Sequence, residues 1–141
     1  MSKITWSTES VALPDLDWAT VERWIKNVAK SEGFRLGRLN YIFCDDERIL
    51  EVNREFLRHD YFTDIITFDY STPSYIEGDM YISLDTVLSN SEQQHVAFKE
   101  ELLRVIIHGV LHLCGINDKG PGEREIMEAH EDKALLLLKE L

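Results

Sequence analysis

Cysteine is scarce in this sequence. The 141 residues include only Cys44 and Cys114, which lie inside or at the end of apolar runs and form no Cys-x-x-Cys pair. A secreted disulfide scaffold needs several cysteines, and a cysteine-ligated zinc site needs closely spaced pairs, so both classes are disfavoured. We expect two buried thiols in a protein of a reducing compartment.

Long apolar runs are also missing. No stretch approaches the ~20 residues that span a bilayer, because Arg104 and His108 interrupt the longest apolar segment. The first ten residues, MSKITWSTES, contain a lysine but no apolar stretch behind it, which does not fit a signal peptide. From these absences we expect a cytoplasmic protein that has no membrane partner.

Basic residues are outnumbered. There are 15 Lys and Arg against 26 Asp and Glu, which gives a formal net charge of −11. A surface of that charge repels nucleic acid over most of its area. An RNA or DNA substrate would therefore need a local basic cleft, a bound ion or a docking partner. The mean charge argues against nucleic acid without excluding it, because an enzyme acts through its site.

The composition and periodicity are those of one globular domain covering residues 1–141. Hydrophobic residues make up 44% and charged residues 29%, and we find no repeat or linker-like tract. Apolar periodicity and turn residues predict strands over 4–9, 38–45, 64–70 and 79–85, and helices over 16–33, 47–58, 85–95, 97–114 and 123–141. In the helix over 47–58 we expect Phe56 and Leu57 to face inward. The order predicts an α+β fold with a single mixed β-sheet packed with helices.

The stretch HGVLHLCGIND carries the chemistry. His108 and His112 are four residues apart on a predicted helix, so their imidazoles point the same way and can reach one ion. Gly115 ends the helix, and the chain can turn back there to offer the carboxylate of Asp118. Three protein ligands with one open position describe a catalytic zinc site. The alternative is that both histidines are core residues bonded to backbone carbonyls.

The same motif excludes one enzyme class. A zincin protease carries H-E-x-x-H, with the glutamate as general base, whereas Gly109 holds that position here. The ligand set does not fix the metal either, since Ni, Co or Mn could also occupy two histidines and one carboxylate. We predict one ion per chain, with zinc as the first choice.

HGVLHLCGIND resembles the motif of the YbeY family of metal-dependent rRNA-maturation endoribonucleases. FTDIITFDY and EGDMYISLD are similar to two further family segments, and the matches run from about Asn53 to Asp118. In that family two helical histidines and a third ligand six residues on hold zinc. The usual third ligand is histidine, so this chain is a variant with Asp118. The resemblance implies a zincin-like metal helix.

The resemblance also implies the activity. It indicates a zinc-dependent, single-strand-specific endoribonuclease that acts in 16S rRNA 3′ end processing and ribosome quality control, with precursor rRNA and the small ribosomal subunit as partners. A family arginine implicated in catalysis falls on Leu57, so its neighbour Arg58 or the helical Arg104 is our candidate for binding phosphate. Glu101 could accept a hydrogen bond from a ligand imidazole, or it could pair with Arg104 along the helix.

Two other functions remain open at this point. One is a metal-dependent hydrolase of a small molecule or peptide. The other is a non-catalytic ribosome assembly factor that uses its metal only for stability. Histidines His95 and His130 have mostly polar neighbours, and we expect both at the surface.

Overall fold

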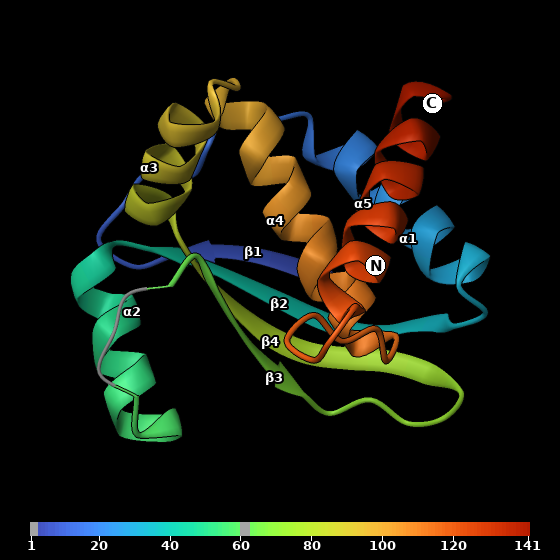
Figure 1. Cartoon of the computed structure of the whole chain (residues 1–141), viewed down its shortest axis with the longest axis horizontal. Helices are drawn as coiled ribbons and strands as arrows, with labels where there is room; N and C mark the ends of the chain where they lie inside the picture. Colours follow the sequence, from blue (N-terminus) through green and yellow to red (C-terminus); the bar gives the residue numbers. More distant parts are fainter. Residues whose placement is uncertain (1–2, 60–62) are drawn as a thin grey trace.

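One mixed four-stranded sheet organises the chain. The structure is a computed structural model that describes residues 3–59 and 63–141. Its strands lie in the order β1-β2-β4-β3 (Figure 1). β1 is parallel to β2, β2 is parallel to β4, and β3 runs antiparallel to β4. The strand bounds are Ile4–Thr8 (β1), Arg35–Cys44 (β2), Ile65–Asp69 (β3) and Tyr75–Ser83 (β4).

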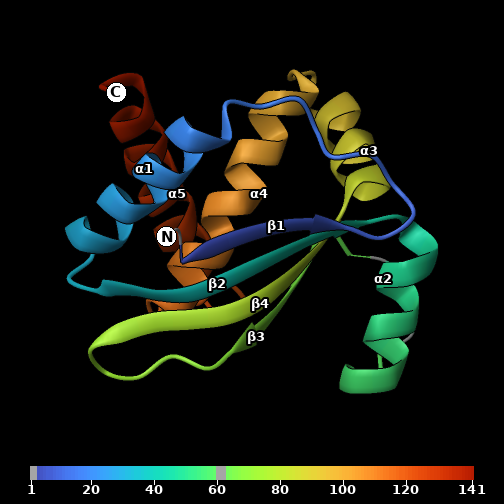
Figure 2. The same ribbon diagram turned by 180° about the vertical axis from the view of Figure 1, so that it is seen from behind.

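The helices cover the two faces of the sheet unequally. Four of them lie on one face, with α4 crossing the middle and α3 and α5 on either side of it (Figures 1 and 2). The bounds are Trp18–Ser31 (α1), Leu84–Gln94 (α3), Phe98–Leu113 (α4) and Glu123–Lys139 (α5). On the other face lies α2 (Asp46–Val52), followed by a π-helical turn, η1 (Asn53–Leu57). This architecture confirms the predicted α+β fold and the predicted order of elements.

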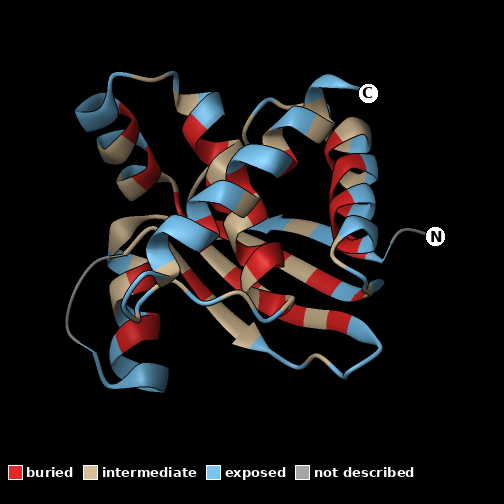
Figure 3. Cartoon of the chain, turned by 45° about the vertical axis from the view of Figure 1, so that its right-hand side comes forward, coloured by how far each residue is buried: buried red, intermediate tan, exposed pale blue. Residues whose placement is uncertain are grey.

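The main core lies between the sheet and the four-helix face. Helix α4 supplies much of it, because most of its residues are buried, as expected for a helix that is apolar nearly all round (Figure 3). The hydroxyl of Tyr41 donates to the carbonyl oxygen of Ile106 at 3.0 Å, so β2 also bonds to α4 through a fully buried side chain. Trp24 of α1 donates through Nε1 to the carbonyl oxygen of Ala134 at 2.6 Å, which joins α1 to α5.

One glycine allows α4 to pass close to the sheet. A Cβ atom built on Gly109 would lie 2.7 Å from Met80 Sδ and 3.0 Å from Ile65 Cδ1. Both contacts are tighter than ordinary van der Waals packing, so the Met80 and Ile65 side chains would have to shift. Position 109 therefore has no room for the glutamate of H-E-x-x-H, so packing against the sheet accounts for the absence of that acid.

The region after α2 differs from the prediction. We expected one helix over 47–58 with Phe56 and Leu57 inward, but α2 gives way to η1 at Asn53, and these two side chains are 56% and 40% exposed. A π turn closes i→i+5 hydrogen bonds and so rotates the following residues relative to an α-helix. The inward prediction for both residues is therefore wrong.

Smaller differences lie at element ends. β4 begins at Tyr75, four residues before the strand predicted over 79–85, because Arg35 and Leu36 of β2 pair with Tyr75 and Ile76. α3 begins one residue earlier than predicted, and the Ser83 side chain caps it by accepting from the amide of Thr86. Cys44 is buried, Cys114 is half-buried, and both are free. Among the described residues, no helix is both long and apolar enough to cross a membrane.

Candidate functional site

The end of α4 brings His108 close to Asp118. Gly115, with a φ of +92°, ends the helix in the left-handed region that glycine favours. Its amide donates to the carbonyl oxygen of His112 at 3.0 Å, and the amide of Ile116 donates to that of Leu111 at 3.1 Å. The chain thereby turns back, and Asp118 Oδ2 lies 3.3 Å from His108 Nε2. The turn predicted from Gly115 is present, and it places the carboxylate beside the first histidine.

A buried carboxylate on α5 fixes the His108 ring. Nδ1 of His108 lies 2.7 Å from Glu131 Oε2, and Glu131 is only 5% exposed. An imidazole that donates from Nδ1 to a carboxylate presents the lone pair of Nε2, which is the arrangement of metal-ligating histidines. We expected Glu101 as a possible acceptor on α4 itself. The acceptor is instead Glu131 from the neighbouring helix.

Arg104 also turns toward α5. Its Nη1 lies 2.8 Å from Glu131 Oε1, and its Nη2 lies 2.8 Å from Asp132 Oδ1. Glu131 thus binds Arg104 with one oxygen and His108 with the other. The partners of Arg104 come from α5, so the predicted pairing with Glu101 along the helix is replaced by a bridge between helices.

The side chains of His108, His112 and Asp118 are chemically suited to bind a divalent transition metal. Two imidazoles on one helical face and one carboxylate are nitrogen and oxygen ligands of the kind that zinc takes. His108 and Asp118 already face each other, whereas His112 lies one turn further along α4 and is half-buried. Within residues 3–59 and 63–141, no three His, Cys, Asp or Glu side chains converge closely enough to form a complete ligand cage.

A cleft of about 900 Å³ opens beside His108. It runs between α3, α4 and α5, and Arg104 and Arg124 are the basic residues that line it, each within ion-pair distance of an acid. Its acidic lining side chains are Asp64, Glu100, Glu101, Asp118, Glu128, Glu131 and Asp132. The cleft is therefore strongly negative and would attract a cation before it attracted an RNA phosphate.

Burial and neighbouring charge shift three pKa values around this cleft. Burial raises the pKa of Asp64 and that of Glu101, because a desolvated carboxyl resists ionisation. Burial opposes the charged form of His108, but the hydrogen bond and charge of Glu131, with Asp118 and Asp64 adding to them, raise its pKa above the ordinary value. A metal ion would relieve this concentration of negative charge.

The second candidate arginine lies elsewhere. Arg58 is exposed at the end of η1, with a φ of +56°. Of the described residues that line the cleft, none belongs to α2 or η1, so the structure brings Arg104 to His108 but leaves Arg58 on a separate element. His95 is exposed as expected. His130 is half-buried, and its Nδ1 lies 2.9 Å from Glu32 Oε2, so its prediction as a plain surface residue is wrong.

Sequence reasoning missed Glu131, Asp132 and Asp64. Glu131 and Asp132 lie more than twenty residues from His108, and their role depends on how α5 packs against α4. Asp64 stands in a recognised segment, but nothing in its immediate neighbours indicates that it faces the cleft. The available signal for Glu131 was an acid on the inward stripe of the helix over 123–141, four residues after Met127 and three before Ala134.

Replacing Glu131 with glutamine is expected to lower the pKa of His108 in metal-free protein. Glutamine retains an oxygen that can accept from Nδ1 but removes the negative charge that stabilises the imidazolium, so the pKa falls as burial regains the larger influence. The measurement is an NMR titration of the His108 ring. Asp132→Asn is the matched control, because it removes a neighbouring charge that touches Arg104 and not His108. A His108 pKa that is unchanged in Glu131→Gln, or lowered equally in both variants, would contradict this account.

Comparisons with known proteins bear on the family and on the fold. The family model described as Endoribonuclease YbeY matches residues 4–139. A curated protein of Bacteroides thetaiotaomicron named Endoribonuclease YbeY is 61% identical over 134 residues, which cover 95% of this chain and 98% of that protein. A protein of the same name from Porphyromonas gingivalis is 49% identical and covers 99% of this chain and 93% of its own length.

A solved structure supports the same fold. The solution structure of a Thermotoga maritima protein superposes with a TM-score of 0.66 and 26% sequence identity, over 96% of this chain and 88% of that one. The sequence match is nearly full-length, and it includes both α4 histidines within the matched residues. On these grounds the chain belongs to the YbeY family of endoribonucleases.

Proposed function

We propose that this protein is a metal-dependent endoribonuclease that cleaves single-stranded RNA, with precursors of ribosomal RNA as its substrates. The observation that carries the proposal is the His108–Asp118 pair at the end of α4, with Glu131 orienting the histidine. Family membership supports the nuclease activity, and the negative cleft supports the need for a cation.

In this proposal His108, His112 and Asp118 hold one ion, with zinc as the preferred metal. When bound there, the ion would polarise a phosphate oxygen and lower the pKa of its water. Glu131 keeps Nε2 of His108 free to bind the metal by accepting a hydrogen bond from Nδ1. Asp118 offers a carboxylate from a turn that Gly115 makes possible.

Two arginines are proposed to contact the scissile phosphate. Arg104 lines the cleft one turn before His108, and its bonds to Glu131 and Asp132 hold the guanidinium in a defined position. Arg58 is the second candidate, through its place beside the position of the family arginine. A cation near the cleavage point offsets the charge that builds on non-bridging oxygens during phosphodiester hydrolysis.

We also propose the wider setting that the family resemblance implies. The protein would act in the cytoplasm as one domain of residues 1–141, on the 3′ end of 16S rRNA in precursors of the small ribosomal subunit, and in ribosome quality control. A precursor subunit whose 3′ end is trimmed by the purified protein would support this setting.

The test of the proposed activity is cleavage of one RNA sequence in single-stranded and in fully paired form. We expect metal-loaded protein to cut the single strand, a chelator to abolish cutting, and added zinc to restore it. Circular dichroism before and after chelation provides the control for folding. Loss of structure on chelation, together with no cleavage by the loaded protein, would favour the assembly-factor alternative. Hydrolysis of a peptide or small ester in place of RNA would favour the other hydrolase alternative.

A further inference from the structure

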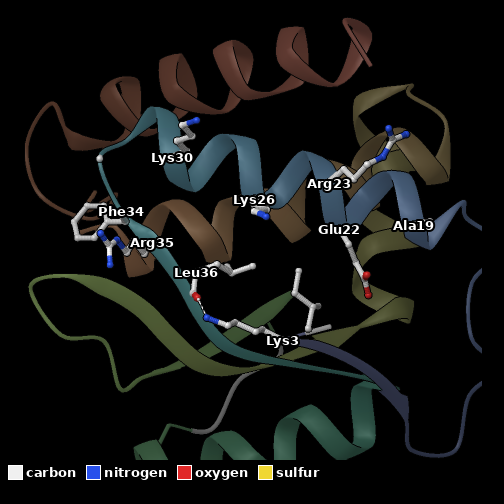
Figure 4. A pocket seen from close by; sticks show the side chains of 11 residues that line it. Lys3, Ala19, Glu22, Arg23, Lys26, Lys30, Phe34, Arg35 and Leu36 are labelled. Atoms are coloured by element: carbon white, nitrogen blue, oxygen red, sulfur yellow. Dashed lines mark hydrogen bonds between the residues drawn. The ribbon is translucent and has the colours of Figure 1, made fainter. Parts of the chain in front are cut away.

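A second groove is rich in basic side chains, in contrast to the acidic cleft. It lies between α1 and the first residues of β1 and β2 and has a volume of about 900 Å³ (Figure 4). Five of the chain's 15 basic residues line it, but only one of its 26 acidic residues, Glu22. The cations are Lys3, Arg23, Lys26, Lys30 and Arg35. On a protein of net charge −11, this is a concentrated basic surface.

The cations of this groove are available to a ligand. All five are exposed, and within the part of the chain that the structure describes no ion pair joins any of them to a carboxylate. Lys3 Nζ donates to the carbonyl oxygen of Leu36 at 3.0 Å, which leaves its charge uncompensated. Glu22 is engaged as well, because its Oε1 accepts from Trp6 Nε1 at 3.0 Å.

Apolar side chains also line the groove. Ile4 is 4% exposed, and Phe34 and Leu36 are half-buried. Figure 4 shows Phe34 and Arg35 at one end of the groove and Lys3 crossing it toward Leu36. Cations and a partly exposed aromatic side chain in one groove suit a nucleotide strand, because phosphates bind positive charge and bases stack on aromatic side chains.

The acidic cleft is poorly suited to bind the phosphates of an RNA strand. Its lining holds seven carboxylates against two arginines, both of which are paired with acids. The two sites share no lining residue. A metal could hold the phosphate that is cut, but the rest of an RNA strand needs cations away from that point, and the groove along α1 provides them.

We propose that this groove is a second RNA-binding surface. It holds the backbone of a single strand on Lys26, Lys30 and Arg35, with a base against Phe34, while another part of the same strand enters the cleft. This inference rests on the proposed function, since it assumes an RNA substrate. Its consequence is that long RNAs bind more tightly than fragments that fill the cleft alone.

The test compares two triple variants that remove the same charge. One is Lys26→Gln, Lys30→Gln and Arg35→Gln in the groove, and the other is a control at exposed lysines elsewhere: Lys99→Gln, Lys133→Gln and Lys139→Gln. Binding of a fluorescent single-stranded RNA 20-mer to chelator-treated protein is measured by fluorescence anisotropy over a range of salt concentrations. Each lost phosphate contact lowers the salt slope by ~0.7, so we expect the groove variant to lose about 2 in slope and at least about tenfold in affinity at low salt. The control keeps both values near wild type.

A kinetic measurement separates this inference from the proposed activity. With metal-loaded protein, the groove variant should raise KM for the 20-mer and leave kcat unchanged, while KM for a tetranucleotide stays as in wild type. Groove-dependent binding without any cleavage would sustain the inference and overturn the proposed function. Equal losses in both triple variants, or none in the groove variant, would overturn the inference alone. So would competition by oligoaspartate or tripolyphosphate as strong as that by unlabelled RNA, because the groove would then be a general anion site.

Discussion

Replacing His108 or His112 with alanine is expected to abolish stoichiometric metal binding and to lower RNA cleavage by at least about 10³-fold, since a catalytic ion stabilises the transition state by several kcal/mol. Asp118→Asn should retain the fold but bind metal weakly, because a neutral amide oxygen is a poorer zinc ligand than a carboxylate. The measurements are metal content of purified protein, zinc affinity and initial cleavage rate.

A matched histidine provides the control for these variants. His95 is exposed at the end of α3 and adopts a φ of +59°, which asparagine also tolerates. His95→Asn should therefore leave metal content and cleavage at wild-type values. Stoichiometric zinc in a His108/His112 double alanine variant would rule out this site, and wild-type zinc affinity in Asp118→Asn would remove Asp118 from the ligand set.

Introducing the protease-like glutamate at position 109 is expected to destabilise the protein by about 4 kcal/mol or more. The new side chain would meet Met80 and Ile65 at its first carbon and would place a carboxylate in an apolar layer with no partner. Since small domains have ~5–15 kcal/mol of stability in total, much of the Gly109→Glu protein should be unfolded. Urea denaturation followed by circular dichroism measures the change.

Two companion variants keep this prediction testable if Gly109→Glu fails to fold. Gly109→Ala adds one carbon against the flexible Met80 side chain while gaining ~1 kcal/mol of helix propensity, so we expect a net loss of only about 1–2 kcal/mol. Ala129→Glu places the same charge on an exposed position of α5 and should change stability by less than about 0.5 kcal/mol. Wild-type stability in Gly109→Glu would show that the helix can move away from the sheet.

The sequence predicts the parts of the site that are close together along the chain. His108, His112 and Asp118 fall within one helix and the turn after it, so helical periodicity and one glycine were enough to propose them. Glu131 could not be found in this way, because its contact with His108 depends on the packing of α5 against α4. The same limit explains why Glu101 was the acid considered for Arg104, whose carboxylate partners lie on α5.

Errors in the fold have a similar origin. Local patterns predicted the order of strands and helices, and the mixed sheet followed from that order. The apolar residues of 47–58 are spaced as in an α-helix, which predicts Phe56 and Leu57 inward. The backbone instead changes to a π turn at Asn53. The basic groove was not predicted either. Three of its five cations lie on α1, but Lys3 precedes β1 and Arg35 begins β2, so only folding brings the full set together.

The bond from Trp24 to Ala134 has a consequence for how the chain is synthesised. Its two residues are 110 positions apart, and α1 packs against α5 in the same region. A nascent chain therefore cannot complete the packing around α1 until α5 has been synthesised, and contacts of such long sequence separation form slowly. Glu131 belongs to α5 too. The His108 ring thus gains its hydrogen-bond partner only once α5 has packed against α4, so the same late step that closes the core also orients this ring.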